Sequence, residues 1–486
     1  MEFSETPALT PIVPGYRLRI LTDSQLDTLQ EHTLEVLSEI GVHCPSERAL
    51  HIYVEHGADV DWERRLVRLP SSVVMDSLAH APRFYRMGAR SKVHDIELDG
   101  RALYCATDGC GVETIELDSG ERRPSRKEDV ARMARMADAL PAIGFYWPMV
   151  SAQDHPATAP LHELEASFNN TVKHVQTETV MDAVSARYAV EMATVIAGDP
   201  EQLRQRPPLS SLICTIAPLA LDQGGMESAL AFAEVGLPVG FMSMANAGST
   251  APATLAGTVV VGDAEIVAAM VLIQMAYPGA PVYHSFMPGI MHPRTGGYLG
   301  TAWEGQILYA VGVEMAHRWG VPTLAGVFGT DARTPGWQSA ADAAPSLMLC
   351  ALCGAETGSG LGLLESCTLL SPESLVLDSD FYHAIRISLE AFDLGPDALA
   401  MDVIRTVGPG GHFLKHKHTR EHIRRRRLSS LVLQPDEQGG YTDPVDEARA
   451  TAHRILQEHH PQPLPEDQQV ELGRILHAAE AEFENR

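Results

Sequence analysis

Carboxylate and aromatic side chains recur directly after the apolar runs of this 486-residue chain. If those runs are parallel strands of one barrel, the residues that follow them converge on a single mouth, where barrel enzymes carry out their chemistry. The residues in these positions are Asp154, Glu178, Pro218, Asn246, His284, Phe286, Phe328, Asp331 and Glu365. On or shortly after the same stretches stand Trp147, Tyr283, Trp303, Glu304, Trp337 and Gln338. Aromatic faces and carboxylates, with few Lys and Arg, suit a small organic cation better than a phosphorylated substrate.

The apolar runs alternate with helical patterns from residue 125 onward. The runs with β character are AIGFYWPMV, VKHVQTE, LSSLICTIAP, LPVGFMSMAN, PVYHSFMPG, VPTLAGVFGT, GSGLGLLES and, with a weaker pattern, SLVLDSD. Helical patterns at 182–197, 254–276, 301–318 and 339–354 separate many of them. About eight such units over about 250 residues predict an α/β fold, a closed (β/α)₈ TIM barrel. A doubly wound open sheet is the competing architecture, but no Gly-x-Gly-x-x-Gly follows the first strand.

The two ends of the chain have different patterns. Thr22 and Gln25 form a capping box before an amphipathic helix at 22–40, and a second helix is expected at 46–56. The segments DIELDGRALYC and GVETIELDSGERR alternate around turns and predict β-hairpins. We therefore predict three parts. They are an N-terminal α+β cap at 1–124, a TIM barrel catalytic domain at 125–395 and a helical C-terminal extension at 396–486.

The segment VGPGGHFLKHKHTREH, residues 407–422, holds four histidines. On a helix, His418 and His422 would share a face, but barrel metal sites draw their ligands from strand ends, and this segment lies beyond the last expected strand. We therefore expect the chain to bind no metal directly. Its GPGG stretch lacks the Gly-Lys-Ser/Thr ending of a phosphate loop and indicates a sharp connection.

Composition excludes several classes of protein. A net charge of −26 argues against a nucleic-acid partner. Seven scattered cysteines, an odd number, are typical of a reducing cytoplasm rather than of a disulfide framework. The amino terminus has no signal-peptide pattern and no apolar run suggests a membrane span, so we expect a soluble cytoplasmic protein. The basic run Arg424–Arg427 stands against the acidic background, either as a solvated helix face or as a docking patch for an acidic partner.

Four segments in chain order resemble the trimethylamine methyltransferase family. They are SGERRPSRKEDVARMARMADALPAIGF (119–145), GDAEIVAAMVLIQMAYPGAPV (262–282), LLESCTLLSPESLVLDSDF (363–381) and VGPGGHFLKHKHT (407–419). The resemblance implies a TIM barrel that binds a methylated amine and a corrinoid protein at its mouth. The methyl group would pass to the reduced cobalt of a cobalamin (corrinoid) that a partner protein carries. The archetypal member uses pyrrolysine; this chain contains only standard residues and is similar to the branch that acts on quaternary amines such as glycine betaine.

Strand-end position and family resemblance together select the candidate site. Candidate catalytic residues are Glu304, Asp331 and Gln338, of which Asp331 and Gln338 lie in GTDARTPGWQ, which resembles a family loop but departs from it at Ala332, Arg333 and Gly336. The substrate-binding candidates are Tyr283, His284, Phe286, Trp303, Phe328, Arg333 and Trp337. The resemblance singles out His412 and Phe413, which would lie near the corrinoid or in a packed corner beneath it. Asn246, selected by its strand-end position, is the third candidate for corrinoid binding. An aromatic on a strand can instead be core, and Phe286 and Phe328 are most open to that interpretation. Arg333 would pair with a substrate carboxylate or face solvent.

The leading interpretation is a methyltransferase that moves a methyl group from a quaternary or tertiary amine to a cognate corrinoid protein. A homo-oligomer is expected for a barrel of this size. One alternative is a betaine-binding or regulatory protein without catalysis. Another is a methyltransferase with a different acceptor, such as tetrahydrofolate. A metal-dependent barrel hydrolase is disfavoured because its first strand would end in His-x-His, whereas WPMVSAQDH stands here.

Overall fold

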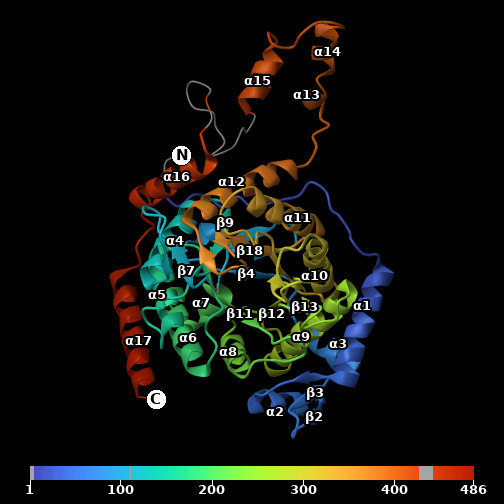
Figure 1. Ribbon diagram of the computed structural model, residues 1–486, viewed down its shortest axis with the longest axis vertical. Helices are drawn as coiled ribbons and strands as arrows, with labels where there is room; N and C mark the ends of the chain where they lie inside the picture. The colour runs from blue at the N-terminus through green and yellow to red at the C-terminus, as the bar shows by residue number, and fades with distance from the viewer. Residues whose placement is uncertain (1–4, 110, 426–439, 441, 486) are drawn as a thin grey trace.

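Eight parallel strands form the barrel at the centre of the computed structural model, which describes residues 5–109, 111–425, 440 and 442–485. Around the ring they are β6 (Tyr104–Thr107), β9 (Ile143–Tyr146), β10 (His174–Thr177), β11 (Leu209–Cys214), β12 (Val239–Ser243), β14 (Val282–Phe286), β17 (Leu324–Gly326) and β18 (Thr357–Leu361). A parallel bridge between His284 and Thr323 closes the ring between β14 and β17. In Figure 1 the strands lie centrally and helices surround them. The predicted TIM barrel is confirmed.

Helices cover the outside of the barrel. They are α4 (Lys127–Ala139), α5 (Ala159–Asn170), α6 (Ala183–Ala197), α7 (Pro200–Gln205), α8 (Gln223–Glu234), α9 (Leu255–Ala276), α10 (Gln306–Trp319), α11 (Trp337–Cys353) and α12 (Pro372–Ser388). Because side chains fill the inside and helices cover the outside, the strands are apolar on both faces. Helix α9 is long and apolar enough to cross a membrane, but 78% of its most apolar window is buried, as in a core helix.

One predicted hairpin and one predicted strand are wrong. The stretch DIELDGRALYC does not form one hairpin, because β5 (Ile96–Leu98) pairs with β4 (Tyr85–Met87) while β6 lies in the barrel between β9 and β18. The barrel therefore begins at Tyr104, inside the range predicted for the cap. The stretch SLVLDSD belongs to helix α12, because the Ser371 hydroxyl accepts a hydrogen bond from the backbone N–H of Ser374 and caps the first turn.

The amino-terminal residues form two small layers beside and below the barrel. Helix α1 (Asp23–Glu35), with its continuation η1 (Val36–Ile40), carries the predicted Thr22–Gln25 capping box. Together with α2 (Glu47–Glu55), α3 (Ser71–Leu78) and the sheet of β1 (Val42–His43), β3 (Leu66–Arg68) and β2 (Asp59–Asp61), it packs on α9. The β4–β5 hairpin, whose connecting segment contains η2 (Lys92–His94), contributes Met87 and Ile96 to the cluster that fills the barrel interior. It closes the end where the strands begin, since the Gly88 carbonyl contacts His174 at the start of β10.

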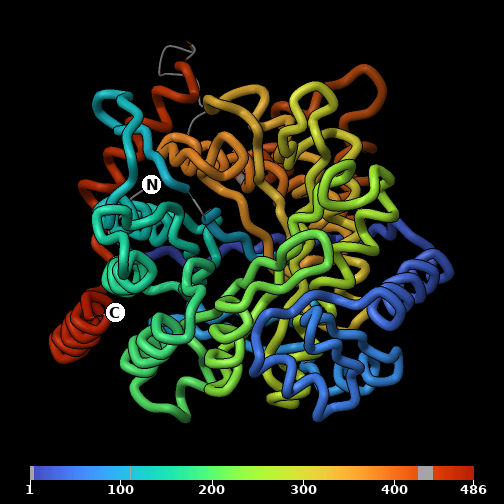
Figure 2. Tube along the Cα trace, turned by 60° about the horizontal axis from the view of Figure 1, so that its bottom comes forward, coloured from blue at the N-terminus to red at the C-terminus, as the bar shows by residue number. Residues whose placement is uncertain are grey.

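The carboxy-terminal extension is helical, as predicted, but it has two separate parts. Helices α13 (Pro396–Leu399), α14 (Met401–Val407) and α15 (Lys417–Arg425) form an arm that projects from the barrel beyond α12 (Figure 1). The chain then returns: α16 (Pro444–Glu458) packs on α12 and α4, and α17 (Glu466–Glu484) packs on α5 and α6, along the outside of the ring (Figure 2). Of the basic run, Arg426 and Arg427 lie outside the described residues.

A buried hydrogen-bonded Asp–His pair fastens the returning extension to the barrel. The side chains of Asp138, near the end of α4, and His459, just after α16, are both fully buried, with 2.7 Å between Oδ2 and Nε2. The Asp138 carboxylate also accepts hydrogen bonds from Thr171 Oγ1 at 2.7 Å, the Val172 N–H at 2.8 Å and the Thr6 hydroxyl. Burial raises the pKa of Asp138, but the hydrogen bond from His459 and the charge of Lys173 outweigh it and lower that pKa to about 2.

This pair predicts how stability depends on acid. Because the folded pKa of Asp138 lies below its unfolded value, the ionised carboxylate stabilises the fold above about pH 4 by about 2 kcal/mol, and this contribution is lost as pH falls toward 2. Asp138→Asn should therefore lower the free energy of unfolding near neutral pH and flatten its decline between pH 5 and pH 2. Urea denaturation across this range measures both effects. The control is Asp76→Asn, at an exposed position on α3. If the free energy of unfolding falls equally in the two variants between pH 5 and pH 2, Asp138 is not the group responsible.

Candidate functional site

A cavity of about 70 Å³ lies where the barrel strands end. Its walls carry two carboxylates, two tyrosines, two methionines, a thiol and small polar side chains. The chief lining residues are Asp108, Asp331, Tyr298, Tyr309, Met244, Met287, Cys367, Thr301, Gln306, Ser359 and Ser366. Among the described residues, no Lys, Arg or His lines this cavity. The site is therefore small, partly aromatic and acidic.

Glycines at two strand ends leave the space in which the cavity forms. A Cβ at Gly326, at the end of β17, would come within 2.8 Å of the Tyr309 ring. Gly360 in β18 has φ +128°, and a Cβ there would stand 2.7 Å from the backbone nitrogen of Gly329. The phenol of Tyr309, on α10, donates a 2.6 Å hydrogen bond to the Gly300 carbonyl. The absence of side chains at these glycines thus lets the tyrosine ring lie against the cavity.

Asp331 joins three loops at the rim. It lies in the loop after β17 and accepts hydrogen bonds from Thr301, through Oγ1 at 2.8 Å and the backbone N–H at 3.3 Å, and from the Ser366 hydroxyl. Its neighbour Thr330 donates to Asp342 on α11 at 2.7 Å. Tyr298, in β16 (Tyr298–Leu299), lies in the same wall, and burial raises the pKa of its phenol, which therefore stays neutral. Asp331 thus fixes the cavity wall and also supplies negative charge to it.

A second carboxylate, Asp108, stands directly after β6. Burial raises its pKa to about 6, although hydrogen bonds from the Cys367 thiol and from the Gly109 N–H partly offset that effect. Burial and the nearby Asp108 raise the pKa of the Cys367 thiol well above its ordinary value, so this thiol is neutral and unsuited to act as a nucleophile. The site therefore holds a carboxylate that titrates near pH 6 beside a protonated thiol.

The loop that presents Ser366 and Cys367 is held in a strained conformation. Glu365, Ser366 and Cys367 have φ of 51°, 54° and 71°, in the left-handed region that costs non-glycine residues free energy. The Ser366 N–H donates to the Thr330 carbonyl at 2.9 Å, and the Glu365 N–H donates to the Ala332 carbonyl at 2.9 Å. Strain of this kind persists only where surrounding contacts fix the backbone, and it is common in functional sites.

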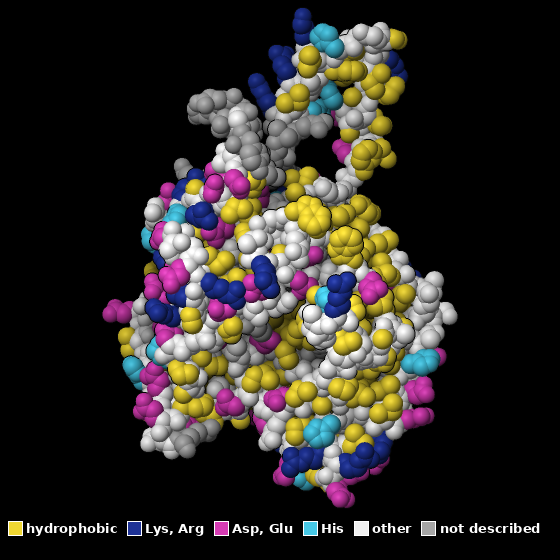
Figure 3. Space-filling model, viewed as in Figure 1, with side chains coloured by type: hydrophobic (Ala, Val, Ile, Leu, Met, Phe, Trp, Pro, Cys, Tyr) yellow, Lys and Arg dark blue, Asp and Glu magenta, His cyan; other side chains and the backbone are white. Residues whose placement is uncertain are grey.

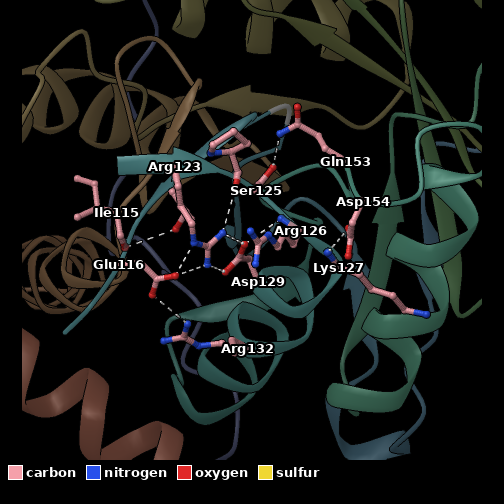
Figure 4. Close-up of polar contacts among 12 residues, drawn as sticks. Ile115, Glu116, Arg123, Ser125, Arg126, Lys127, Asp129, Arg132, Gln153 and Asp154 are labelled. Atoms are coloured by element: carbon pink, nitrogen blue, oxygen red, sulfur yellow. Dashed lines mark hydrogen bonds and ion pairs between the residues drawn. The ribbon is translucent and has the colours of Figure 1, made fainter. Parts of the chain in front are cut away.

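The hairpin of β7 (Glu113–Ile115) and β8 (Arg122–Pro124), which the sequence predicted, supplies some of those contacts. Strand β7 pairs with β20 (Leu369–Leu370), which pairs with β19 (Leu363–Leu364), so the strained loop connects two strands of this small sheet. Arg122 binds Glu365 with 3.0 Å between Nη1 and Oε1. Arg123 binds both Glu116 and Asp129, the latter at the start of α4, at 2.8 Å (Figure 4). The hairpin thereby fastens the loop to the barrel wall.

Several candidates from the sequence lie on the exposed rim rather than in the cavity. The Trp303 and Trp337 side chains are each 79% exposed. Trp303 and Glu304 lie in the short helix η3 (Trp303–Gly305), and Glu304, Arg333 and Gln338 are also exposed. Of the three candidate catalytic residues, only Asp331 lines the cavity.

Other candidates are packed in the core. Tyr283 points into the barrel, where its phenol contacts Gln176 and the Ser211 carbonyl. His284 points outward and lies 2.9 Å from Asp263 of α9. Phe286 fits against Gly262 of α9 and Gly312 of α10, and Phe328 packs edge-on against Phe381 of α12. The core interpretation considered for Phe286 and Phe328 therefore matches their observed positions, because outward side chains at strand ends face the helices.

The three corrinoid candidates are not brought together. Asn246 lies in β13 (Asn246–Ala247), which pairs with β15 (Gly289–Met291) beside β16, and its side chain donates to Ser249 at 2.7 Å. His412 and Phe413 are exposed on the arm. Sequence analysis missed Asp108, Tyr298 and Cys367. Asp108 obeys the same strand-end rule as Asp331 and would have been selected if β6 had been recognised as a barrel strand.

Among the residues that the structure describes, two clusters have the side chains to hold a metal, and neither lies at the cavity. His418 and His422 share a face of α15, as expected for a helix, and meet Asp397; His155 and His162 meet Glu480. In the second cluster the Lys127 ammonium lies 3.0 Å from His162 Nδ1, which opposes a cation. In the first, an ion pair between His422 and the exposed Asp397, 3.2 Å long, already accounts for the arrangement.

Comparison with known proteins identifies the family. A sequence model described as Trimethylamine methyltransferase (MTTB) matches residues 4–483. The chain belongs to this family. Trimethylamine methyltransferase MttB of Desulfitobacterium hafniense (strain DSM 10664 / DCB-2) is 31% identical over 97% of this chain and 96% of its own length. Glycine betaine methyltransferase of Desulfitobacterium hafniense (strain Y51) is 30% identical over 85% of this chain and 86% of its own.

A solved structure has the same fold. The monomethylamine methyltransferase (MtmB) of Methanosarcina barkeri superposes with a TM-score of 0.52, over 98% of this chain and 90% of its own length, at 10% sequence identity. At that identity the likeness shows the fold alone. The family resemblance in the four sequence segments is thus confirmed, and this MTTB family chain has the barrel expected of the family.

The β7–β8 hairpin generates a stability prediction. Arg123→Met leaves the nearly buried Asp129 without its cationic partner, so we expect the free energy of unfolding to fall by about 2 kcal/mol, less than for a fully buried pair because Arg123 is partly exposed. Arg19→Met, which breaks an exposed pair with Asp23, should leave the urea midpoint unchanged. Equal midpoints for the two variants would show that the hairpin is not fastened through Arg123.

Proposed function

We propose that this MTTB family chain transfers a methyl group from a quaternary or tertiary amine to a corrinoid carried by a separate protein. The observation that carries the proposal is the cavity at the barrel mouth, which has two carboxylates and two tyrosines in its wall and, among its described lining residues, no Lys, Arg or His. Family membership and the glycine betaine methyltransferase at 30% identity support the reaction class.

The cavity suits a compact cationic head group. Asp108 and Asp331 supply negative charge, while the Tyr298 and Tyr309 rings can each contribute roughly 0.5–2 kcal/mol of cation–π attraction, depending on desolvation. Gln306 Oε1 is buried without a hydrogen-bond partner in the structure and offers a further acceptor. A phosphate or carboxylate group would meet repulsion from the same wall. The cavity therefore favours binding of a cation over binding of an anion.

The chemistry asks little of this chain beyond binding. A quaternary ammonium leaves as a neutral tertiary amine, so no residue has to donate a proton or form a covalent adduct. The corrinoid's reduced cobalt supplies the nucleophile when the partner is bound. What this chain supplies is orientation and exclusion of water, with one N–CH₃ bond held toward the mouth. The neutral thiol of Cys367 and the neutral phenols are consistent with a site that moves no proton.

The cavity is too small to admit the methyl acceptor, a corrinoid, which would therefore stay outside it. A space of about 70 Å³ holds only a few water molecules, far less than a corrin ring needs. The partner's corrinoid would therefore rest over the mouth, where Asn246 lies at the rim in the sheet that also contains Tyr298. Arg333 is exposed two residues after Asp331 in the same loop, and we propose that it pairs with a substrate carboxylate such as that of a betaine.

The raised pKa of Asp108 predicts a pH-dependent affinity. Above about pH 6 the carboxylate is ionised and attracts a cation; below it, protonation removes that charge, so the Kd of tetramethylammonium or glycine betaine should rise by up to tenfold per pH unit. Asp108→Asn should weaken binding at pH 7.5 and abolish the change in Kd near pH 6. Calorimetry between pH 5 and pH 8 measures this. If the Kd of Asp108→Asn still changes near pH 6, another group is responsible for the titration.

Turnover tests the function itself. The purified chain would be incubated with cob(I)alamin and a panel of trimethylamine, glycine betaine, carnitine, choline and proline betaine, and methylcobalamin would be followed by absorbance. We expect turnover with one amine, and a KM raised at least tenfold in Asp331→Asn. Glu304→Gln separates the cavity from the exposed rim: an equal loss in that variant would move the site outward. Binding without turnover would favour a regulatory protein. The absence of both binding and turnover would overturn the proposal.

A further inference from the structure

The projecting arm, residues 392–425, carries apolar side chains that nothing in the described part of the chain covers. The large exposed apolar residues on it include Phe392, Leu394, Leu399, Phe413, Leu414 and Ile423; Phe392 is 88% exposed and Leu414 is 75% exposed. Figure 3 shows hydrophobic side chains along its length. Exposed apolar patches of this kind mark interaction surfaces.

The arm's folded form depends on contacts within itself. Asp397 of α13 accepts a hydrogen bond from His418 through its carbonyl oxygen at 3.0 Å and pairs with His422 at 3.2 Å, which holds α15 against α13. Among the described residues of α13 to α15, the polar contacts of charged side chains join arm residues to one another. The arm is therefore an ordered projection, presented away from its own barrel.

The charge of the arm is opposite to that of the body. Residues 392–425 contain six Lys and Arg and four Asp and Glu, a net charge of +2, whereas the whole chain has a net charge of −26. The rest of the chain is therefore even more acidic than that total. A basic, apolar arm and an acidic body are complementary surfaces, and a second copy of the chain offers that body.

A groove on the body has the matching chemistry. It measures about 520 Å³ and lies between the start of α11, the middle of α12 and the start of α16, close to where the arm leaves and returns. Its apolar walls include Trp337, Leu377 and Phe381, and Asp380 and Asp443 also line it. The highly exposed indole of Trp337 stands beside a ready-made apolar pocket with acidic edges.

We propose that the arm of one copy docks into this groove of a second copy, with Phe413 and Leu414 against Trp337 and Phe381 and with the arm's Lys and Arg facing Asp443. If the exchange is reciprocal, the same two surfaces are used twice around a two-fold axis, as in closed symmetric dimers. The groove begins at Pro335, in the loop that carries Asp331, so the partner's arm braces one wall of the cavity. This inference is independent of the proposed function.

Sedimentation of the full chain, without any other protein, tests the docking. The wild type should sediment as an oligomer, and Phe413→Asp/Leu414→Asp and Trp337→Asp should each sediment at the 52.7 kDa of a single chain. Val470→Asp, at an equally exposed apolar site on α17, is the matched control and should remain oligomeric. Because all three sites are exposed, thermal unfolding should be that of the folded barrel in every variant. A monomeric wild type, or an arm variant that stays oligomeric, would overturn the proposal.

A disulfide experiment identifies the occupant of the groove. One variant carries Leu414→Cys and another carries Trp337→Cys; after they are mixed and oxidised, we expect a disulfide-linked dimer that neither variant forms alone. A chain carrying both substitutions should crosslink between copies. If it instead forms a disulfide within one chain and runs as a monomer, the arm folds into its own groove and the second-copy proposal is wrong.

Discussion

Closure of eight short strands into a ring is the constraint on which the remaining structure depends. Each strand is only three to six residues long, so no strand pair could be stable alone, and the ring removes every exposed edge. Closure also brings the ends of β6, β17 and β18 to one place. Asp108, Asp331 and Gly360, separated by up to about half of the chain, become neighbours for that reason alone.

The cavity at that place is open space enclosed by loops that are held rigidly. Glycines keep side chains out of the space, while Asp331 ties the loops around it and the left-handed backbone of Glu365–Cys367 is held from several sides. The β7–β8 hairpin bears on this loop through Arg122 and on α4 through Arg123. Such preorganisation is what a site needs if its contribution is to hold a cation in one orientation rather than to exchange protons with it.

The loop after β17 connects the cavity and the groove. Its first residues, Thr330 and Asp331, form cavity wall, and its last, Pro335 to Trp337, form the groove on the outside of the barrel. Anything that fills the groove therefore contacts a loop whose other part lines the cavity. The arm that we infer to fill it belongs to the extension that leaves from α12 and is anchored again by His459 at Asp138.

Apolar periodicity predicted the barrel and most of its strands and helices, and four sequence segments predicted the family. The strand-end rule predicted Asp331 at the mouth of the barrel, because strand-end position is a local property. The sequence could not place Tyr283, Phe286 and Phe328, since the tilt of the closed strands decides whether an aromatic faces the interior, the helices or the mouth. Asp108 was hidden because the four-residue strand before it follows a DG turn and resembles half of a hairpin. Tyr298 and Cys367 enter the cavity from loops, whose paths follow from contacts with distant segments. Which side chains share the cavity depends on closure of the barrel and on loop packing, so no local sequence pattern could predict it.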